Sequence, residues 1–188
     1  MIRSSALAAT LFLLFSSASF AQTSNPRLDL FGGYSHVGNY GIGLNGWIGS
    51  ANWHLFKFIG LEGDLSGEYG SIGAGEVLSN TPNHINSRMH SFDVGPNGMY
   101  RPASGKYDAF GHLLFGFSHT NVNAAGVGNG DTAFSWALGG GADYNFASMW
   151  AARVQLDYLR TNFFGSGQNH ARVALGLVYH FGKSGGTE

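Results

Sequence analysis

Apolar residues recur at every second position through most of this sequence, and this alternation constrains the fold more than any other feature. Successive side chains of a β-strand point to opposite faces, so a period of two predicts strands with one apolar face and one polar or small-residue face. Eight such segments are separated by glycine-rich or polar stretches. They cover residues 27–36, 44–55, 59–69, 88–101, 107–119, 133–146, 150–161 and 170–181.

The lengths of the segments and of their connections favour strands that cross a membrane. A tilted strand needs about 9 to 11 residues to cross a hydrocarbon core, whereas ordinary strands hold about 5 to 6 residues. The connections at 56–58, 102–106 and 147–149 are tight, and those at 71–87, 120–132 and 162–169 are longer; only 37–41 is short where a long loop is expected. This alternation predicts an all-β fold, an eight-stranded antiparallel up-and-down transmembrane β-barrel with both termini on the short-turn side.

Aromatic residues cluster near the two ends of the segments. Such belts mark the two lipid–water interfaces of a membrane barrel. Trp53, Tyr100, Tyr107, Tyr144, Trp150, Tyr179 and Phe181 lie toward the tight turns or the C-terminus, and Tyr34, Tyr69, Phe117, Trp136 and Tyr158 lie toward the long loops.

Composition argues against the alternative of a secreted soluble barrel with the apolar face inside. Charged residues make up only 11% of the 188 residues, and 30 residues are glycine; a soluble domain has about 25% charged residues. The non-apolar face therefore predicts a filled interior with isolated charges. These are Glu62, Asp64, Glu68, Asp93, Asp143, Arg153, Asp157 and Arg172. The formal net charge of −1 gives no electrostatic reason to expect a nucleic-acid partner.

The N-terminus has the pattern of a secretory signal peptide. A basic start precedes an apolar run of ten residues from Ala6 to Phe15, and small residues stand at Ser19 and Ala21. The run has half the length that a membrane anchor needs. We therefore expect a signal peptide over residues 1–21, a barrel over 22–181 and a short periplasmic tail over 182–188. The absence of cysteine excludes disulfides, thiolate zinc sites and a cysteine nucleophile.

Four stretches resemble the small outer-membrane β-barrel domain family, which includes the barrel domains of outer-membrane proteins A and X. They are Asp29-Leu-Phe-Gly-Gly-Tyr-Ser35, Gly60-Leu-Glu-Gly-Asp64, Gly139-Gly-Gly-Ala-Asp-Tyr144 and Gly176-Leu-Val-Tyr-His-Phe181. The resemblance implies an integral protein of the bacterial outer membrane, surrounded by outer-membrane lipid and lipopolysaccharide. Gly176, Tyr179 and Phe181 are similar to the signal that the barrel-assembly machinery reads. Ala174 and the tail after Phe181 depart from that signal.

No catalytic, cofactor or metal motif emerges, so we do not expect an enzyme. The eight histidines are scattered, without two of them at helical spacing for a metal. His90-Ser91 and Ser118-His119 are neighbours in sequence, so within each pair the two side chains point to opposite faces of a strand and cannot share a proton directly. Gly126-Val-Gly-Asn-Gly130 lacks the strand–helix context of a phosphate loop.

Two details of the strands can be predicted. Pro96 lies within the fourth segment, where it cannot donate a ladder hydrogen bond. We expect a β-bulge at this position; if the strand were broken there instead, the count of eight strands would change.

The tight connection at 147–149 brings Asp143 opposite Arg153, both pointing inward near the periplasmic end. Asp157 and Arg172 are the nearest competing partners.

Three functions remain open. The first is a non-enzymatic barrel with a structural role or a surface-interaction role through its extracellular loops. The second is a narrow porin-like channel for small solutes or ions, which requires a continuous water path past the inner charges. The third, an enzyme acting on lipid or peptide, has no residue that singles out a substrate. The sequence does not identify a loop ligand or an oligomeric state.

Overall fold

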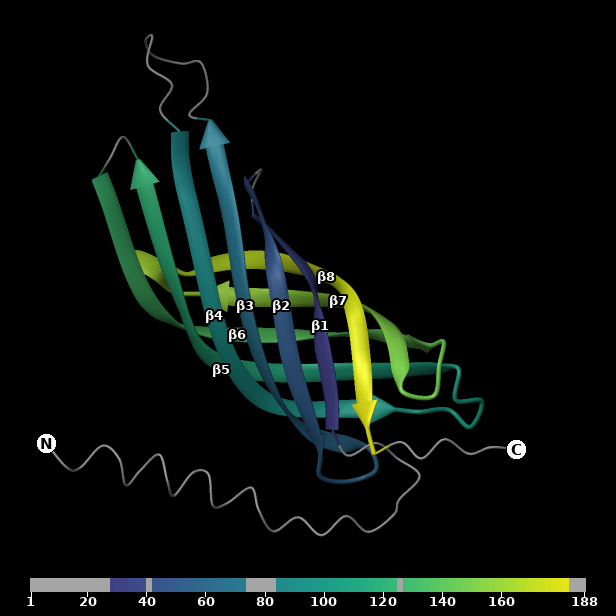
Figure 1. The fold of residues 1–188 in the computed structure, drawn as a ribbon. Coiled ribbons are helices and arrows are strands. Elements are labelled where there is room, and N and C mark those ends of the chain that lie inside the picture. Colours follow the sequence, from purple (N-terminus) through teal and green to yellow (C-terminus); the bar gives the residue numbers. More distant parts are fainter. Residues whose placement is uncertain (1–27, 40–41, 74–83, 125–126, 183–188) are drawn as a thin grey trace, which may run out of the picture.

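The computed structural model describes residues 28–39, 42–73, 84–124 and 127–182, and it is a closed barrel of eight antiparallel strands in sequence order (Figure 1). The all-β, up-and-down fold predicted from the alternation is confirmed. The strands are β1 (Leu28–Asn39), β2 (Ile42–His54), β3 (Ile59–Gly73), β4 (His84–Tyr100), β5 (Tyr107–Ala124), β6 (Val127–Asn145), β7 (Trp150–Thr161) and β8 (Gln168–Phe181). A short 3₁₀ turn, Phe163–Gly165, lies between β7 and β8.

The alternating sequence produces two chemically different faces. Along β7, exposed and buried residues alternate without a break from Trp150 to Thr161. The exposed face of the barrel carries most of its large apolar side chains, including Trp47, Leu65, Phe92, Phe115 and Leu156. In a membrane barrel, this outward apolar face contacts lipid, and the interior contains the polar groups.

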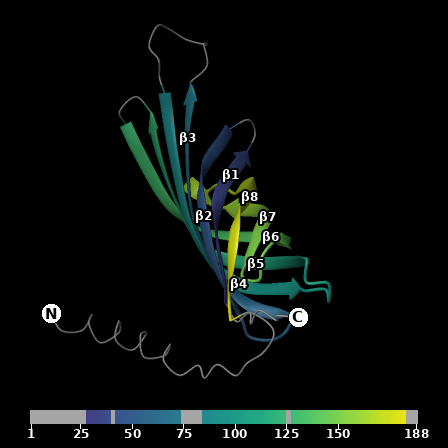
Figure 2. The same ribbon diagram turned by 45° about the vertical axis from the view of Figure 1, so that its right-hand side comes forward.

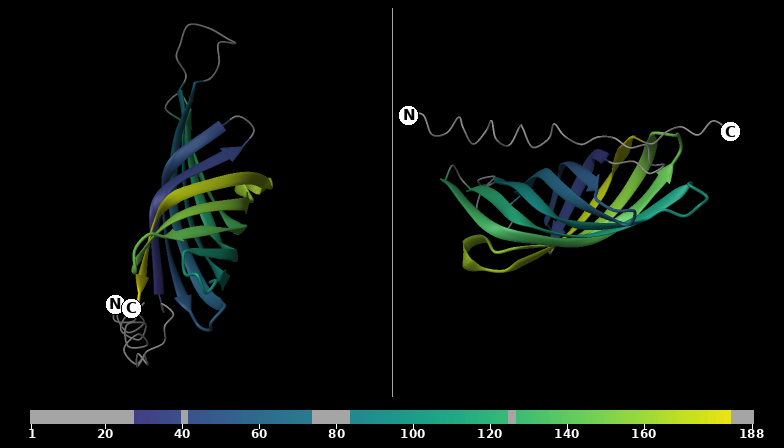
Figure 3. Two further views of the ribbon diagram at one scale, coloured as in Figure 1. Left: turned by 90° about the vertical axis from the view of Figure 1, so that its right-hand side faces the viewer. Right: turned by 90° about the horizontal axis from the view of Figure 1, so that it is seen from below.

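The first and last strands close the barrel. β1 pairs with β8 from Leu28↔Phe181 to Gly38↔Ala171, and the two strands run side by side in Figures 1 and 3. The start of β1 and the end of β8 therefore lie at the same end of the barrel as the tight turns. The expected signal peptide, 1–21, lies outside the described residues, as does the tail beyond Gly182. Among the described residues, no helix is long and apolar enough to cross a membrane.

Four neighbouring strands continue past the rest of the barrel on the long-loop side. The ladder between β2 and β3 ends at Asn45↔Tyr69, but β3 continues to Gly73 and pairs there with β4. Similarly, β5 and β6 pair as far as Ala124↔Val127, whereas the ladder between β6 and β7 begins only at Ser135↔Thr161. We call residues 70–73, 84–88, 119–124 and 127–134 the projecting sheet; Figure 2 shows its β3–β4 part rising beyond β1 and β2.

The projecting sheet makes several strands longer than the sequence predicted. The predicted segments ended at residues 69 and 119 and began at 88 and 133, where the apolar alternation stops. The hydrogen-bonded ladders continue, because a hairpin in water does not need an apolar face to keep its backbone paired. The first two strands are also longer than predicted, since β1 extends to Asn39 and β2 begins at Ile42. Their added pairs shorten the connection between them.

Pro96 interrupts a ladder without breaking the strand. It pairs with Leu61 on β3, while the ladder with β5 stops at Val94↔Phe115 and resumes at Asn97↔His112. The same number of residues separates these two pairs on both strands, so no extra residue is inserted. The predicted bulge is therefore wrong. Proline removes one donor from the ladder, and the register is kept on both sides of it.

Candidate functional site in the barrel interior

A network of polar side chains occupies the barrel interior. The structure places all eight charged residues that were expected inside at positions with 2% exposure or less; they are Glu62, Asp64, Glu68, Asp93, Asp143, Arg153, Asp157 and Arg172. They come from five strands, because every strand sends alternate residues inward. Their contacts join strands that are not neighbours, so the network crosses the interior.

Arg172 is the centre of the network. Its Nη2 atom lies 2.9 Å from Oδ2 of Asp64 and 2.7 Å from Oδ2 of Asp157, and its Nε donates a hydrogen bond of 2.8 Å to Asp157. The guanidinium thus connects β8 with β7 beside it and with β3 across the barrel. A fully buried arginine needs such partners, because an unpaired buried charge is costly.

Arg153 and Asp143 form a second ion pair, between neighbouring strands. They are register partners on β7 and β6, and the guanidinium donates two hydrogen bonds to the carboxylate, of 2.7 and 2.8 Å. The Cζ atom of Arg153 also lies 4.0 Å from the ring centroid of Phe110 and 5.1 Å from that of Phe31. Two aromatic rings and a bidentate carboxylate contact surround this cation near the tight turn between β6 and β7.

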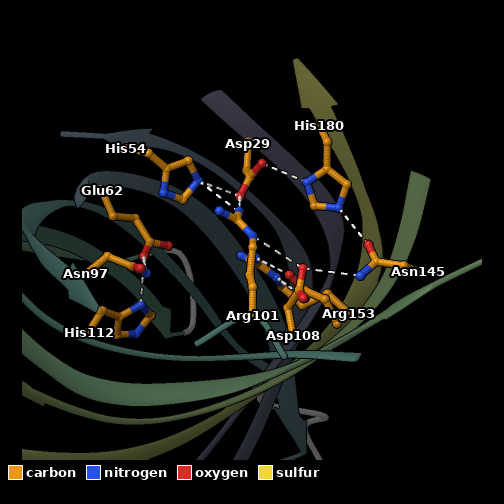
Figure 4. A network of polar contacts seen from close by, with 11 residues as sticks. Asp29, His54, Glu62, Asn97, Arg101, Asp108, His112, Asn145, Arg153 and His180 are labelled. Atoms are coloured by element: carbon orange, nitrogen blue, oxygen red, sulfur yellow. Dashed lines mark hydrogen bonds and ion pairs between the residues drawn. The ribbon is translucent and has the colours of Figure 1, made fainter. Parts of the chain in front are cut away.

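His112 joins two carboxylates across the barrel. Its Nδ1 lies 3.0 Å from Glu62 and its Nε2 lies 3.0 Å from Asp157; Figure 4 shows the Glu62 contact together with Asn97. Ionised carboxylates only accept hydrogen bonds, so both ring nitrogens donate and the ring is an imidazolium. Sequence reasoning missed this role, because Glu62, His112 and Asp157 lie on non-neighbouring strands and their separation in sequence carries no signal.

A third cluster closes the end of the barrel with the tight turns. Asp29 accepts hydrogen bonds of 2.7 Å from His180 and 2.8 Å from Arg101, and its other close partner is Nε2 of His54 at 2.7 Å. His180 contacts Oδ1 of Asn145 with its second nitrogen, at 3.0 Å (Figure 4). The Asn145 amide nitrogen donates to the Gly105 carbonyl oxygen at 3.0 Å and to Asp108 at 3.2 Å.

Hydroxyl groups hold two further interior carboxylates, Glu68 and Asp93. Ser35 and Ser66 donate to the two oxygens of Glu68, at 2.8 and 3.3 Å, and Ser135 donates to Asp93 at 2.7 Å. Ser91 is hydrogen-bonded to Ser118 at 2.7 Å. The two histidines beside these last serines in sequence, His90 and His119, are exposed on the opposite face, which is not an arrangement for proton transfer from serine.

Among the described residues, no three His, Cys, Asp or Glu side chains are grouped so that they could hold a metal ion. The interior also contains apolar side chains that the alternation did not assign. Phe31, Ile48, Ala151, Ala174 and Val178 form one buried cluster, and Val37, Leu44, Met89, Leu114, Ala137, Leu159 and Phe163 form another. The interior thus contains both ion pairs and apolar packing.

The fold and its interior can now be compared with known proteins. The sequence matches the outer membrane protein beta-barrel domain over residues 7–181, which is most of the chain. The protein belongs to the outer membrane protein β-barrel domain family. It is therefore an integral outer-membrane protein. A search of curated proteins by sequence gave no match.

Several solved outer-membrane barrels share this fold. Ail, the attachment invasion locus protein of Yersinia pestis, has 16% identity and a TM-score of 0.55, covering 84% of this chain and 99% of its own. Neisserial surface protein A has 9% identity and a TM-score of 0.59, with 82% and 96% covered. The N-terminal barrel of Pseudomonas aeruginosa OprF has 15% identity and a TM-score of 0.50, with 82% and 98% covered.

The expected assembly residues of this family member lie at the β1–β8 seam. Gly176 lies opposite Gly33, and a Cβ atom on Gly176 would overlap the Gly32 carbonyl and lie 2.8 Å from the Phe31 ring. Glycine thus permits the close approach of the two strands. Phe181 is 44% exposed, and its ring centroid lies 4.5 Å from that of Tyr179.

The pair of Asp143 and Arg153 provides a direct measure of coupling inside the barrel. In a double-mutant cycle with Asp143→Asn and Arg153→Met, we expect a coupling energy of about 1–3 kcal/mol, because each single change leaves the partner charge buried without its counter-ion. The readout is urea unfolding of the refolded barrel in detergent micelles. Asp143 paired in a cycle with exposed Arg160 is the control, and additive effects in both cycles would contradict the assignment.

Proposed function

We propose that this protein is a non-enzymatic outer-membrane barrel that acts at the cell surface through its projecting sheet and extracellular loops, with an interior that serves stability. The projecting sheet is the observation that carries this proposal. It extends the barrel wall beyond the end of the lipid-facing ladders on the extracellular side. A protein that only sealed or filled the membrane would not need this extension.

In the part of the chain that the structure describes, the projecting sheet has two strand edges without a neighbouring strand, and the backbone N–H of Phe164 contacts the β6 edge at Asp131. Within the described residues, 127–134 of β6 pair with β5 alone, and 70–73 of β3 pair with β4 alone. Unpaired strand edges offer backbone donors and acceptors to an added strand. Ail, which shares the fold, is named for attachment and invasion. We therefore propose attachment to another surface as the role of this extracellular extension.

Shortening the β5–β6 hairpin tests this role. We expect bacteria that display a variant with residues 121–132 replaced by a tight Asn-Gly turn to attach to cultured cells several-fold less than bacteria with the intact barrel. Both proteins should reach the outer membrane equally, because the lipid-facing ladders are unchanged. As a control, the same number of residues is inserted into the periplasmic turn at 102–106. Equal attachment by bacteria with the shortened hairpin and by bacteria with the intact barrel would refute the proposal.

The ion pairs across the interior argue against the alternative of a narrow channel. Arg172 and His112 connect opposite walls, and a conducting pore needs a continuous water path. We expect the refolded wild type to show no steady conductance in planar bilayers, and a double variant Arg172→Ala/Asp64→Ala to show discrete openings. Openings of equal size in both proteins would support the channel instead.

We further propose that the barrel-assembly machinery recognises the end of β8, and that lipid and lipopolysaccharide surround the finished barrel. Phe181 ends the outward aromatic row at the seam. Phe181→Asp is expected to lower the outer-membrane yield several-fold, measured by heat-modified mobility of membrane fractions. Glu188→Lys, in the tail, should leave the yield unchanged. Equal yields of Phe181→Asp and wild type would contradict the role of this residue.

A further inference from the structure

The barrel interior contains more acidic groups than basic groups. Eight carboxylates are buried, namely Asp29, Glu62, Asp64, Glu68, Asp93, Asp108, Asp143 and Asp157. The basic side chains that contact them are those of Arg101, Arg153, Arg172, His54, His112 and His180. Even with every one of these histidines counted as a cation, the acidic groups outnumber the basic groups by two. An unpaired buried charge is costly, so such a carboxylate takes up a proton, accepts hydrogen bonds or is met by a counter-charge.

Unpaired oxygen atoms show where that counter-charge can lie. Among the described residues, Oε1 of Glu62, Oδ1 of Asn97 and both amide atoms of Asn52 are buried without a hydrogen-bond partner. The three residues are at most 1% exposed. They lie on β3, β4 and β2, which are consecutive strands in the wall. Buried polar atoms without partners are rare in folded proteins.

The register brings these three side chains to one place. Asn52 is the cross-strand partner of Glu62, and Asn97 is the partner of Gly60, two residues before Glu62. The absence of a side chain at Gly60 leaves the space that the Asn52 amide oxygen occupies, because a Cβ there would collide with that oxygen. Asn97 also donates a hydrogen bond to Oε2 of Glu62, and Figure 4 shows the two side chains in contact beside His112.

The neighbours of Glu62 occupy only one of its two carboxylate oxygens. His112 and Asn97 both bind Oε2 of Glu62, so Oε1 remains. One carboxylate oxygen and two amide oxygens are ligands of hard cations such as Ca²⁺ and Na⁺, which complete their coordination with water. We propose that Asn52, Glu62 and Asn97 bind one such cation inside the barrel, and that this cation offsets part of the excess negative charge.

Glu68 provides a matched control for this site. It is also a fully buried glutamate on β3, but both of its oxygens are hydrogen-bonded, to Ser35 and Ser66. Glu62→Gln and Glu68→Gln therefore remove the same charge from the same strand at the same degree of burial. Only Glu62→Gln replaces the charged ligand of the proposed cation by a neutral amide.

The test is urea unfolding of the refolded full-length barrel in lipopolysaccharide-free detergent, with CaCl₂, NaCl or choline chloride at equal ionic strength. We expect the unfolding midpoint of wild type and of Glu68→Gln to rise with the logarithm of the Ca²⁺ or Na⁺ concentration, with the slope of one bound ion. Glu62→Gln should lose this rise, and choline should have no effect. Asn52→Ala, which keeps every charge, should shift the rise to a several-fold higher ion concentration.

Two results would overturn the proposal. If Ca²⁺, Na⁺ and choline give the same midpoints, the unpaired oxygens are satisfied by water and no cation binds. If Glu62→Gln and Glu68→Gln lose the same part of the ion dependence, the ions act by general screening of the interior charge. Should Glu62→Gln fail to refold, Asn52→Ala decides between these outcomes, since an unchanged ion response in that variant also contradicts the site.

Discussion

Replacement of Arg172 by methionine is expected to lower the free energy of unfolding by about 3–5 kcal/mol, because it leaves two buried carboxylates without their shared cation. Asp64 and Asp157 both lie within 3 Å of this guanidinium. The measurement is urea unfolding of the refolded barrel in micelles, followed by tryptophan fluorescence. Adding Asp64→Asn to this variant should restore part of the loss, because Asp64 has no other ion-pair partner among the described residues, whereas Asp157 keeps its contact with His112.

Arg160→Met is the matched control for that experiment. Arg160 is exposed and its guanidinium contacts only Asn169 among the described hydrogen bonds, at 3.4 Å, so its loss should change the free energy of unfolding by less than about 0.5 kcal/mol. Similar losses for Arg172→Met and Arg160→Met would mean that the central ion pairs do not stabilise the barrel.

Leu156→Arg is expected to lower the free energy of unfolding by about 2–4 kcal/mol in lipid bilayers, because it places a charge on the lipid-facing surface near the middle of β7. Leu156 is 61% exposed and lies between the aromatic residues Trp150 and Tyr158. Ala152 is on the same face of the same strand, close to the periplasmic turn, and Ala152→Arg should cost only about 0–1 kcal/mol. Equal costs at the two depths would contradict the assignment of the membrane-facing surface.

The lipid-embedded part of the fold could be predicted from the sequence because lipid imposes a rule on every second residue. Beyond the lipid-facing ladders this alternation stops, and the predicted strands stopped there as well. Residues 121–130 are rich in asparagine and glycine, with water on both faces of the hairpin, so no alternation marked the outer parts of β5 and β6. Their pairing depends on backbone hydrogen bonds, which any residue except proline can make.

The interior contacts were predictable only across neighbouring strands. A tight turn sets the register of β6 and β7, and this register was enough to place Asp143 opposite Arg153. The partners of Arg172 were not predictable in this way, because Asp64 lies 108 residues away on a non-neighbouring strand. That contact depends on the curvature and diameter of the closed wall. The same reason explains why the roles of His112 and of the cluster around Asp29 were missed.

The way in which β8 meets β1 has a consequence for the order of folding. Seven of the eight ladders join strands that are consecutive in sequence, whereas the seam joins residues such as Asp29 and His180, which are 151 positions apart. Closing a chain segment of that length costs about 2–3 kcal/mol more entropy than closing a hairpin of about ten residues. The seam should therefore form last.

Before the seam forms, the chain is a curved sheet with two free edges, β1 and β8, whose backbone groups cannot remain unpaired in lipid. Spontaneous insertion of such a sheet would be slow, and a second protein that lends a strand edge to β8 would remove this barrier until β1 displaces it. The two glycines at positions 33 and 176 give β1 a close approach during that exchange. The late closure of one ladder thus makes the rate of folding depend on how the seam forms, while the stability of the finished barrel depends on its interior.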